Sequence, residues 1–189
     1  MSTTRPPETP ELTVTDSPAA TDLALVSDGL DGFNVERSGI DDRRPLAVLV
    51  HEPGTGRVLG GLTGRTSLGL FFVDLFFLPP ELRGSGLGGE VLRRAEQEAR
   101  DRGCRSAVLY TISFQAPGFY LKHGWTVLGE VRCDPPGTSR VFLTKNLEGP
   151  RTGPNPPTTE GSSEEHRPSP LGRSSPLGTL RPAFSAAVP

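Results

Sequence analysis

A glycine-rich turn, Arg83-Gly84-Ser85-Gly86-Leu87-Gly88-Gly89, follows an apolar run and precedes a segment with helical periodicity. Glycines there allow backbone N–H groups to converge on an anion at the N-terminus of the helix, where the helix dipole also favours negative charge. Arg83 adds a side chain that can make a charge-assisted hydrogen bond to the same anion. The turn therefore predicts a site for a phosphate or diphosphate group, although the glycines could also serve only a tight turn.

Two other phosphate-binding patterns fit this turn less well. Gly84, Gly86 and Gly89 match the G-x-G-x-x-G spacing of dinucleotide-binding enzymes. Those enzymes need a ribose-binding carboxylate about 20 residues further on, and residues 106–111 offer none. No Gly-Lys-Ser/Thr follows the glycines, which excludes a Walker loop. A nicotinamide-dependent reductase therefore ranks as a third hypothesis.

A second motif lies downstream, Ala116-Pro117-Gly118-Phe119-Tyr120-Leu121-Lys122-His123-Gly124-Trp125. This segment is similar to the A-x-x-F-Y-x-K-x-G-F/W motif of the GNAT N-acetyltransferases, and Arg83-x-x-Gly86-x-Gly88 resembles the acetyl-coenzyme A signature of that family. The resemblance covers about residues 11–146. It implies an α/β (α+β) fold whose central mixed, mostly antiparallel sheet has flanking helices and splays open after the strand at 70–78.

The resemblance also implies that acetyl-coenzyme A lies in the gap of the splayed sheet, with no metal required. Backbone amides of the glycine-rich turn would hold its diphosphate, and exposed backbone of the strand before the turn would pair with pantetheine. Ser113 stands where many members carry Asn, and its shorter hydroxyl could keep part of that contact or leave it to water. The implied cofactor-binding residues are Phe76, Leu78, Arg83, Gly84, Ser85, Gly86, Leu87, Gly88, Gly89, Ser113 and Phe119.

Two residues are candidates for catalysis. The resemblance implies that Tyr120 lies near the coenzyme thiol, where an acid would stabilise the departing thiolate. A tyrosine that only packs in the core would fit the sequence as well. Asp74 is the candidate base, because an amine must lose its proton before it attacks. A carboxylate in an apolar strand is costly unless it is paired, and a place near the sheet opening would let Asp74 reach the substrate directly or through water. A structural, hydrogen-bonded Asp74 is an equal alternative. The amide of Phe76 could donate to the acetyl carbonyl oxygen as that oxygen gains charge.

Other conspicuous side chains are better explained by packing or exposure. His51 and His123 are expected at the surface, and neither is a catalytic candidate. Trp125 is expected to close the core at the start of a strand. The aromatic residues of the apolar run are expected to pack against helices on both faces of a central strand rather than to stack on bases; they are Phe71, Phe72, Phe76 and Phe77.

The remaining pattern predicts a mixed α/β domain. Residues 11–15 are expected as a first strand, and residues 18–36 as one helix or two short ones. Strands at 46–50 and 57–62 are joined by Pro53-Gly54-Thr55-Gly56, which favours an antiparallel hairpin. The later elements are a strand over 70–78, a helix from 87 to near Gly103, a strand over 106–111, a short helix over 116–123 and strands over 126–131 and 140–144.

Composition sets the boundaries of this domain. The 189 residues are enough for one domain. Only 34% of them are hydrophobic, and the 23 glycines and 20 prolines are more than a soluble domain usually has. Residues 1–10 and 147–189 are expected to be disordered, leaving residues 11–146 as the domain. A net charge of −2 makes nucleic acid an unlikely partner, and without a signal peptide or membrane span the protein is expected in the cytoplasm. Cys104 and Cys133 are expected as free thiols.

The leading functional hypothesis is transfer of acetyl from acetyl-coenzyme A to a primary amine by direct attack in a ternary complex. The acceptor would be a small molecule or a peptide, bound by residues 33–37, 41–44 and 64–69. The alternative is a noncatalytic acyl-coenzyme A sensor that signals through its tail. A homodimer could form through an exposed edge such as the strand at 140–144.

Overall fold

The computed structural model describes residues 10–148, which belong to two compact units divided between Asp41 and Asp42. In the first unit, α1 (Ala20–Ser38) is one continuous helix that ends at Gly39, whose positive φ of 71° allows its amide to donate to the Val35 carbonyl at 2.8 Å. The expected strand over residues 11–15 is wrong: these residues are exposed and have no strand partner within residues 10–148. Alternation of apolar residues alone supplies no partner for the backbone hydrogen bonds of a strand.

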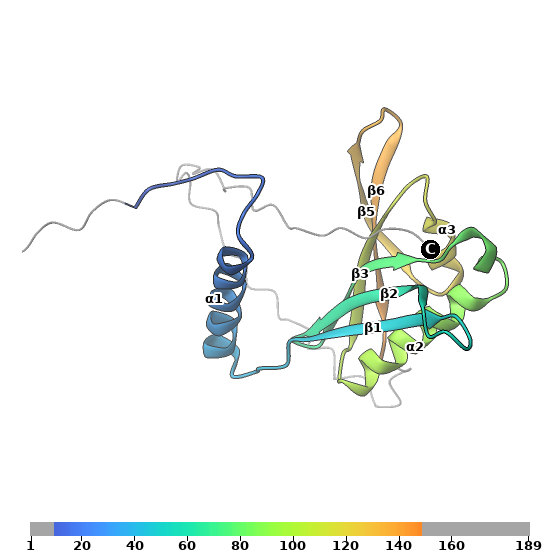
Figure 1. The fold of residues 1–189 in the computed structure, drawn as a ribbon, viewed down its shortest axis with the longest axis horizontal. Helices are drawn as coiled ribbons and strands as arrows, with labels where there is room; N and C mark the ends of the chain where they lie inside the picture. Colours follow the sequence, from blue (N-terminus) through green and yellow to red (C-terminus); the bar gives the residue numbers. More distant parts are fainter. Residues whose placement is uncertain (1–9, 149–189) are drawn as a thin grey trace, which may run out of the picture. The chain divides into compact units, whose positions relative to one another are not determined.

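The second unit is built on one six-stranded sheet with flanking helices (Figure 1). Its strand order is β1-β2-β3-β4-β6-β5, and every neighbouring pair is antiparallel except β3 and β4. This arrangement confirms the expected mixed, mostly antiparallel α/β fold. The elements are β1 (Arg44–His51), β2 (Val58–Ser67), β3 (Leu70–Phe77), a 3-10 turn η1 (Pro80–Leu82), α2 (Leu87–Asp101), β4 (Ser106–Ile112), α3 (Pro117–Lys122), β5 (Thr126–Cys133) and β6 (Thr138–Asn146).

A β-bulge at Asp74 changes which residues of β3 face the core. The register against β2 shifts there, and Asp74 is left without a partner in that strand. Phe71 and Val73 face the core before the bulge, and Phe76 does after it. Phe77 is 50% exposed, so the expectation that all the aromatic residues of this run pack in the core is wrong for Phe77. Neighbouring residues of a strand point to opposite faces, and Phe77 lies on the face away from the core.

Helix α2 packs on one face of the sheet against β1, β2 and β3 (Figure 1). Its apolar residues recur at helical spacing and bury a continuous stripe. Trp125 is 2% exposed, as expected for a core residue. The stripe of α2 consists of Val91, Leu92, Ala95 and Ala99, which join Leu62, Phe71, Ala107, Leu109 and Leu143 of the sheet in one hydrophobic cluster.

The edge of the sheet differs from the expectation. The strand β6 lies between β4 and β5, so residues 140–144 are not an exposed edge, and β5 is the outer strand. The order of the strands in the sequence does not reveal which of β5 and β6 pairs with β4. In the structure the second strand of the β5–β6 hairpin pairs with β4. No helix within residues 10–148 is long and apolar enough to cross a lipid bilayer. The expected disordered tail lies almost wholly outside the described residues.

Candidate active site

The sheet opens between β3 and β4. These parallel strands share only three residue pairs, the last of which joins Phe72 to Val108. Beyond that pair β3 continues against β2 and β4 continues against β6, so each strand has one edge facing the gap. This divergence confirms the expected splay. Phe76, one of the residues expected to bind coenzyme A, lies on β3 beyond the divergence.

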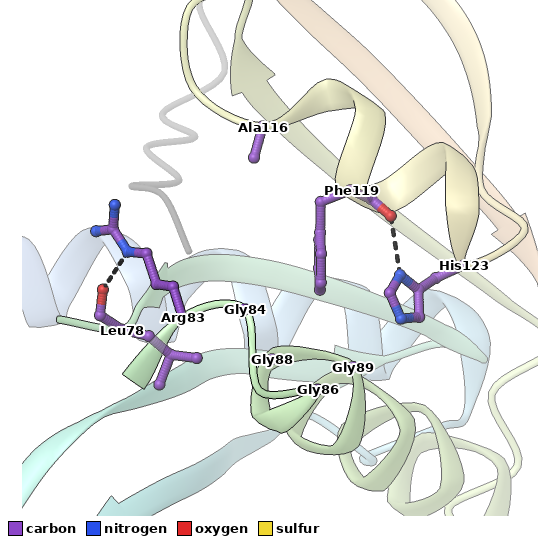
Figure 2. A pocket seen from close by; sticks show the side chains of 9 residues that line it. All are labelled: Leu78, Arg83, Gly84, Gly86, Gly88, Gly89, Ala116, Phe119 and His123. Atoms are coloured by element: carbon purple, nitrogen blue, oxygen red, sulfur yellow. Dashed lines mark hydrogen bonds between the residues drawn. The ribbon is translucent and has the colours of Figure 1, made fainter. Parts of the chain in front are cut away.

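A pocket of about 290 Å³ lies at the N-terminus of α2, between that helix and α3 (Figure 2). The glycine-rich turn forms one wall and α3, with the residue before it, forms the other. Leu78, Arg83, Gly84, Gly86, Gly88, Gly89 and Phe119, all predicted from the sequence to hold the coenzyme, line it together with Ala116 and His123.

The backbone of the turn suits an anion. Gly84 and Gly86 have φ values of 76° and 87°, which L side chains rarely adopt, and Gly86 caps α2. The first backbone hydrogen bond of α2 runs from the Glu90 amide to the Gly86 carbonyl at 3.1 Å. The amides of the first turn lack such intrahelical acceptors. The N-terminal turn of α2 therefore offers N–H groups and a favourable dipole to an anion.

Arg83 and Ser85 are held by the turn itself. Arg83 Nε donates to the Leu78 carbonyl at 2.8 Å, which bridges the end of β3 and the start of the turn (Figure 2). The Ser85 hydroxyl donates to the Leu82 carbonyl at 3.2 Å. Because one N–H group of the Arg83 guanidinium makes the Leu78 contact, its four terminal N–H groups can serve a bound anion.

Helix α3 supplies aromatic groups to the opposite wall. The Phe119 ring stands edge-on to Phe76 at 5.9 Å between centroids and lies 3.4 Å from where a Cβ on Gly88 would be. His123 lies against Phe119 with centroids 4.5 Å apart, and its Nδ1 is 2.8 Å from the Phe119 carbonyl. That carbonyl can only accept, so Nδ1 carries a hydrogen. His123 Nε2 lies 2.6 Å from the position of a Cβ on Gly89, so only glycine fits there without moving the ring.

Tyr120 is 2% exposed and packs edge-on to Trp125 and Phe119, at 5.9 and 5.2 Å between centroids. Burial disfavours the phenolate and raises the pKa of Tyr120 well above its ordinary value of 10. The hydroxyl is therefore protonated at neutral pH and can donate a proton or a hydrogen bond. Its role in catalysis is still a prediction.

Asp74 forms an ion pair with Arg65, which lies beside it on β2. The guanidinium carbon of Arg65 also lies 4.6 Å from the centroid of the Phe72 ring. Both members of the pair are partly exposed, at 33% for the Asp74 side chain and 26% for Arg65. This pairing explains how a carboxylate is tolerated in an apolar strand. The assignment of Asp74 as the base remains a prediction.

Ser113 lies apart from the pocket. Its hydroxyl accepts a hydrogen bond from the Ser139 amide at 3.1 Å, and its own amide donates to the Ser139 carbonyl at 2.8 Å. These bonds extend the β4–β6 pairing beyond Ile112. A cofactor contact by Ser113 therefore stays a prediction.

Comparison with known proteins agrees with this geometry. The acetyltransferase (GNAT) family matches residues 22–125, more than half of the chain. The chain belongs to this family. A curated acetyltransferase of Agrobacterium fabrum is 35% identical over 122 residues, which are 65% of this chain and 88% of the relative. The blasticidin-S acetyltransferase of Streptomyces morookaense is 35% identical over 116 residues, 60% of this chain and 85% of the relative.

Solved structures give the same result. A crystal structure of an Agrobacterium tumefaciens protein matches this GNAT acetyltransferase with a TM-score of 0.64 and 32% identity, over 72% of this chain and 98% of the other. An acetyltransferase from Bacillus cereus matches with a TM-score of 0.59 and 26% identity, over 71% and 97% of the two chains. The fold predicted from the two motifs is thus confirmed.

Sequence reasoning missed His123, which it placed at the surface although the residue is half-buried and forms part of the pocket wall of this acetyltransferase. The signal was available: His123 follows Phe119 by four residues, so both lie on one face of a helical turn. Sequence reasoning also missed Glu96, a buried carboxylate that joins α2 to β6 and to the residue before β5. Glu96 accepts hydrogen bonds from Trp125 Nε1 at 3.0 Å and Lys145 Nζ at 2.6 Å, and Lys145 Nζ also donates to the His123 carbonyl at 2.7 Å.

Proposed function

We propose that this acetyltransferase transfers the acetyl group of acetyl-coenzyme A to a primary amine by direct attack in a ternary complex. The observation that carries the proposal is the glycine-lined pocket at the N-terminus of α2, next to the place where β3 and β4 diverge. A diphosphate and a pantetheine chain need those two features side by side. The dinucleotide spacing lacks its ribose-binding carboxylate, and the Walker loop lacks its Gly-Lys-Ser/Thr.

The residues of the turn fit a coenzyme A diphosphate. A Cβ on Gly84 or on Gly86 would meet nothing within 4 Å, so at both positions the missing side chains leave space open rather than allowing close packing within the protein. That space adjoins the amides of the first turn of α2 and the side chain of Arg83. Gly88 and Gly89 have no side chains, so the rings of Phe119 and His123 can lie close to the backbone of α2.

The chain's own residues can supply the proton transfers. Acetyl-coenzyme A would bring an activated acetyl group as a thioester, so no covalent enzyme intermediate is needed. Asp74, directly or through water, would take the proton that the amine must lose. Tyr120, kept protonated by burial, would donate to the departing thiolate, and the Phe76 amide would stabilise charge on the acetyl oxygen.

The relatives favour a small molecule as the acceptor. One curated relative is named for its action on blasticidin-S. The similarity to that enzyme extends over 85% of its length. An amine on a small molecule is therefore the first acceptor class to screen, with peptide amines as the second.

The decisive test of cofactor binding is the melting temperature of the full chain with acetyl-coenzyme A, with NADH as the control. At about 100 times its Kd, a ligand that binds only the folded state adds about 2.7 kcal/mol to the free energy of unfolding, which shifts the melting temperature by several degrees. We expect a shift with acetyl-coenzyme A and none with NADH. The absence of a shift with acetyl-coenzyme A would refute the site.

The catalytic role of Tyr120 is tested with Tyr120→Phe. Loss of a general acid lowers kcat by about 100-fold or more. The melting shift with acetyl-coenzyme A should persist in the variant, because the substitution removes only the hydroxyl. An unchanged kcat would show that Tyr120 is only a core aromatic.

A further inference from the structure

A stacked arginine lies on the sheet face opposite α2. The guanidinium carbon of Arg140, on β6, is 5.1 Å from the centroid of the Tyr110 ring on β4. Tyr110 also packs against Phe142, with 5.5 Å between the ring centroids. Tyr110 is 5% exposed but does not belong to the hydrophobic cluster beneath α2, to which its neighbour Leu109 belongs. Since adjacent residues of a strand point to opposite faces, Tyr110 and Arg140 lie on the far face.

Arg140 has no acidic register partner in the neighbouring strands. Its partners in the strand registers are Ile112 on β4 and Val131 on β5, both apolar. In the part of the chain that the structure describes, residues 10–148, Arg140 forms no ion pair. On the other side of the gap Arg65 pairs with Asp74. Within residues 10–148, therefore, no ion pair balances the positive charge of Arg140 on this face.

The position of Arg140 follows from the sheet register. Val108 is the last residue of β4 that pairs with β3, and Tyr110 is the next residue of β4 on the same face. Arg140, over the Tyr110 ring, therefore borders the gap where it has begun to open. The coenzyme pocket lies between α2 and α3 and has its own cation, Arg83. Arg140 is thus separate from the diphosphate site and faces the side from which α2 is absent.

A guanidinium stacked on an aromatic ring keeps its N–H groups in the plane, directed outward, and two of them match the two oxygens of a carboxylate. We propose that Arg140 binds a carboxylate of the acceptor, so that the substrate class of this enzyme is an amine that also carries a carboxylate. Tyr110, itself packed against Phe142, holds the guanidinium at the edge of the gap, and the amine of the same molecule reaches the thioester. This inference rests on the proposed function and adds the acceptor class to it.

The test compares pairs of acceptors that differ only in the carboxylate. ω-Amino acids from β-alanine upward in chain length are each compared with the corresponding ω-amino amide, with release of the coenzyme thiol as the readout. In the longer pairs the methylene chain insulates the amine, so that both members present nearly the same nucleophile. We expect the acid of at least one pair to have a kcat/KM about 10- to 100-fold above that of its amide, because hydrogen bonds to charged groups are that strong.

Arg140→Gln should reduce this ratio to near one, mainly through a higher KM for the acids, and Arg140→Lys should restore part of it. Arg132→Gln is the matched control: Arg132 is an exposed arginine on β5 whose register partner is Ser139, and the ratio should stay as in the wild type. Equal use of acids and amides, preference for the amides, no turnover of any acid, or a preference that survives Arg140→Gln would each overturn the proposal. Binding of acetyl-coenzyme A, measured in the same samples, separates these outcomes from failure of the proposed function itself.

Discussion

The buried ion pair between Glu96 and Lys145 gives a quantitative prediction. The Glu96 side chain is 4% exposed and accepts hydrogen bonds from Lys145 at 2.6 Å, Trp125 at 3.0 Å and Arg100 at 3.4 Å. Lys145→Met would leave the carboxylate buried with a weakened set of partners. Removing one member of a fully buried pair costs about 3–5 kcal/mol, and because Lys145 is 19% exposed and Arg100 remains, we expect a smaller loss of about 2–3 kcal/mol.

Urea unfolding of the full chain measures this loss. The double variant Glu96→Gln with Lys145→Met removes the charge yet keeps an acceptor for Trp125, so it should recover about 1–2 kcal/mol of the loss. Lys122→Met, at an exposed position on α3, is the matched control and should change stability by less than about 0.5 kcal/mol. The reasoning is refuted if Lys145→Met costs less than about 1 kcal/mol, or if the double variant is no more stable than the single one.

Three further outcomes are expected. Gly89→Ala should lower the free energy of unfolding by about 1–2 kcal/mol because its Cβ would lie 2.6 Å from His123 Nε2, whereas in a His123→Ala background the same change should cost nothing; equal effects in both backgrounds would exclude the contact. Burial raises the pKa of Tyr120, so the protonated acid is retained as pH rises, and kcat should show no fall with a midpoint below pH 10. Burial likewise raises the pKa of the Cys104 thiol, so iodoacetamide followed by mass spectrometry should label Cys133 first; earlier labelling of Cys104 would contradict its burial.

Local pattern was enough to predict most of the fold. The hairpin around Gly54 and the strand, turn and helix around Gly86 depend on turn residues and periodicity that act within a few positions. The splay came from resemblance, because no local rule says where two parallel strands part. The wrong strand at residues 11–15 and the misplaced edge at residues 140–144 both concern which strands pair, a property that single segments do not encode.

Several of the predicted residues line one pocket, whereas the contacts between side chains around it were missed. Glycines and the aromatic pair Phe119 and Tyr120 carry their spacing in the sequence. The pairing of Arg65 with Asp74 depends on the hairpin register, which no spacing rule specifies. The contact of Glu96 with Lys145 joins residues 49 positions apart, and it depends on the three-dimensional fold that brings these two side chains together.

The short contact between β3 and β4 has a consequence for folding. Strands β1, β2 and β3 follow one another in the chain, and β4, β5 and β6 form a second consecutive set. Three of the four pairings within these sets close short loops, and only β4 with β6 spans a longer segment. The sets meet through three residue pairs and through the crossover helix α2. Because non-local contacts are formed at a greater entropic cost, each set should collapse early, and their joining should be the slow step of folding. The junction of β3 and β4, beside the proposed substrate site, would then be the last part of the sheet to form.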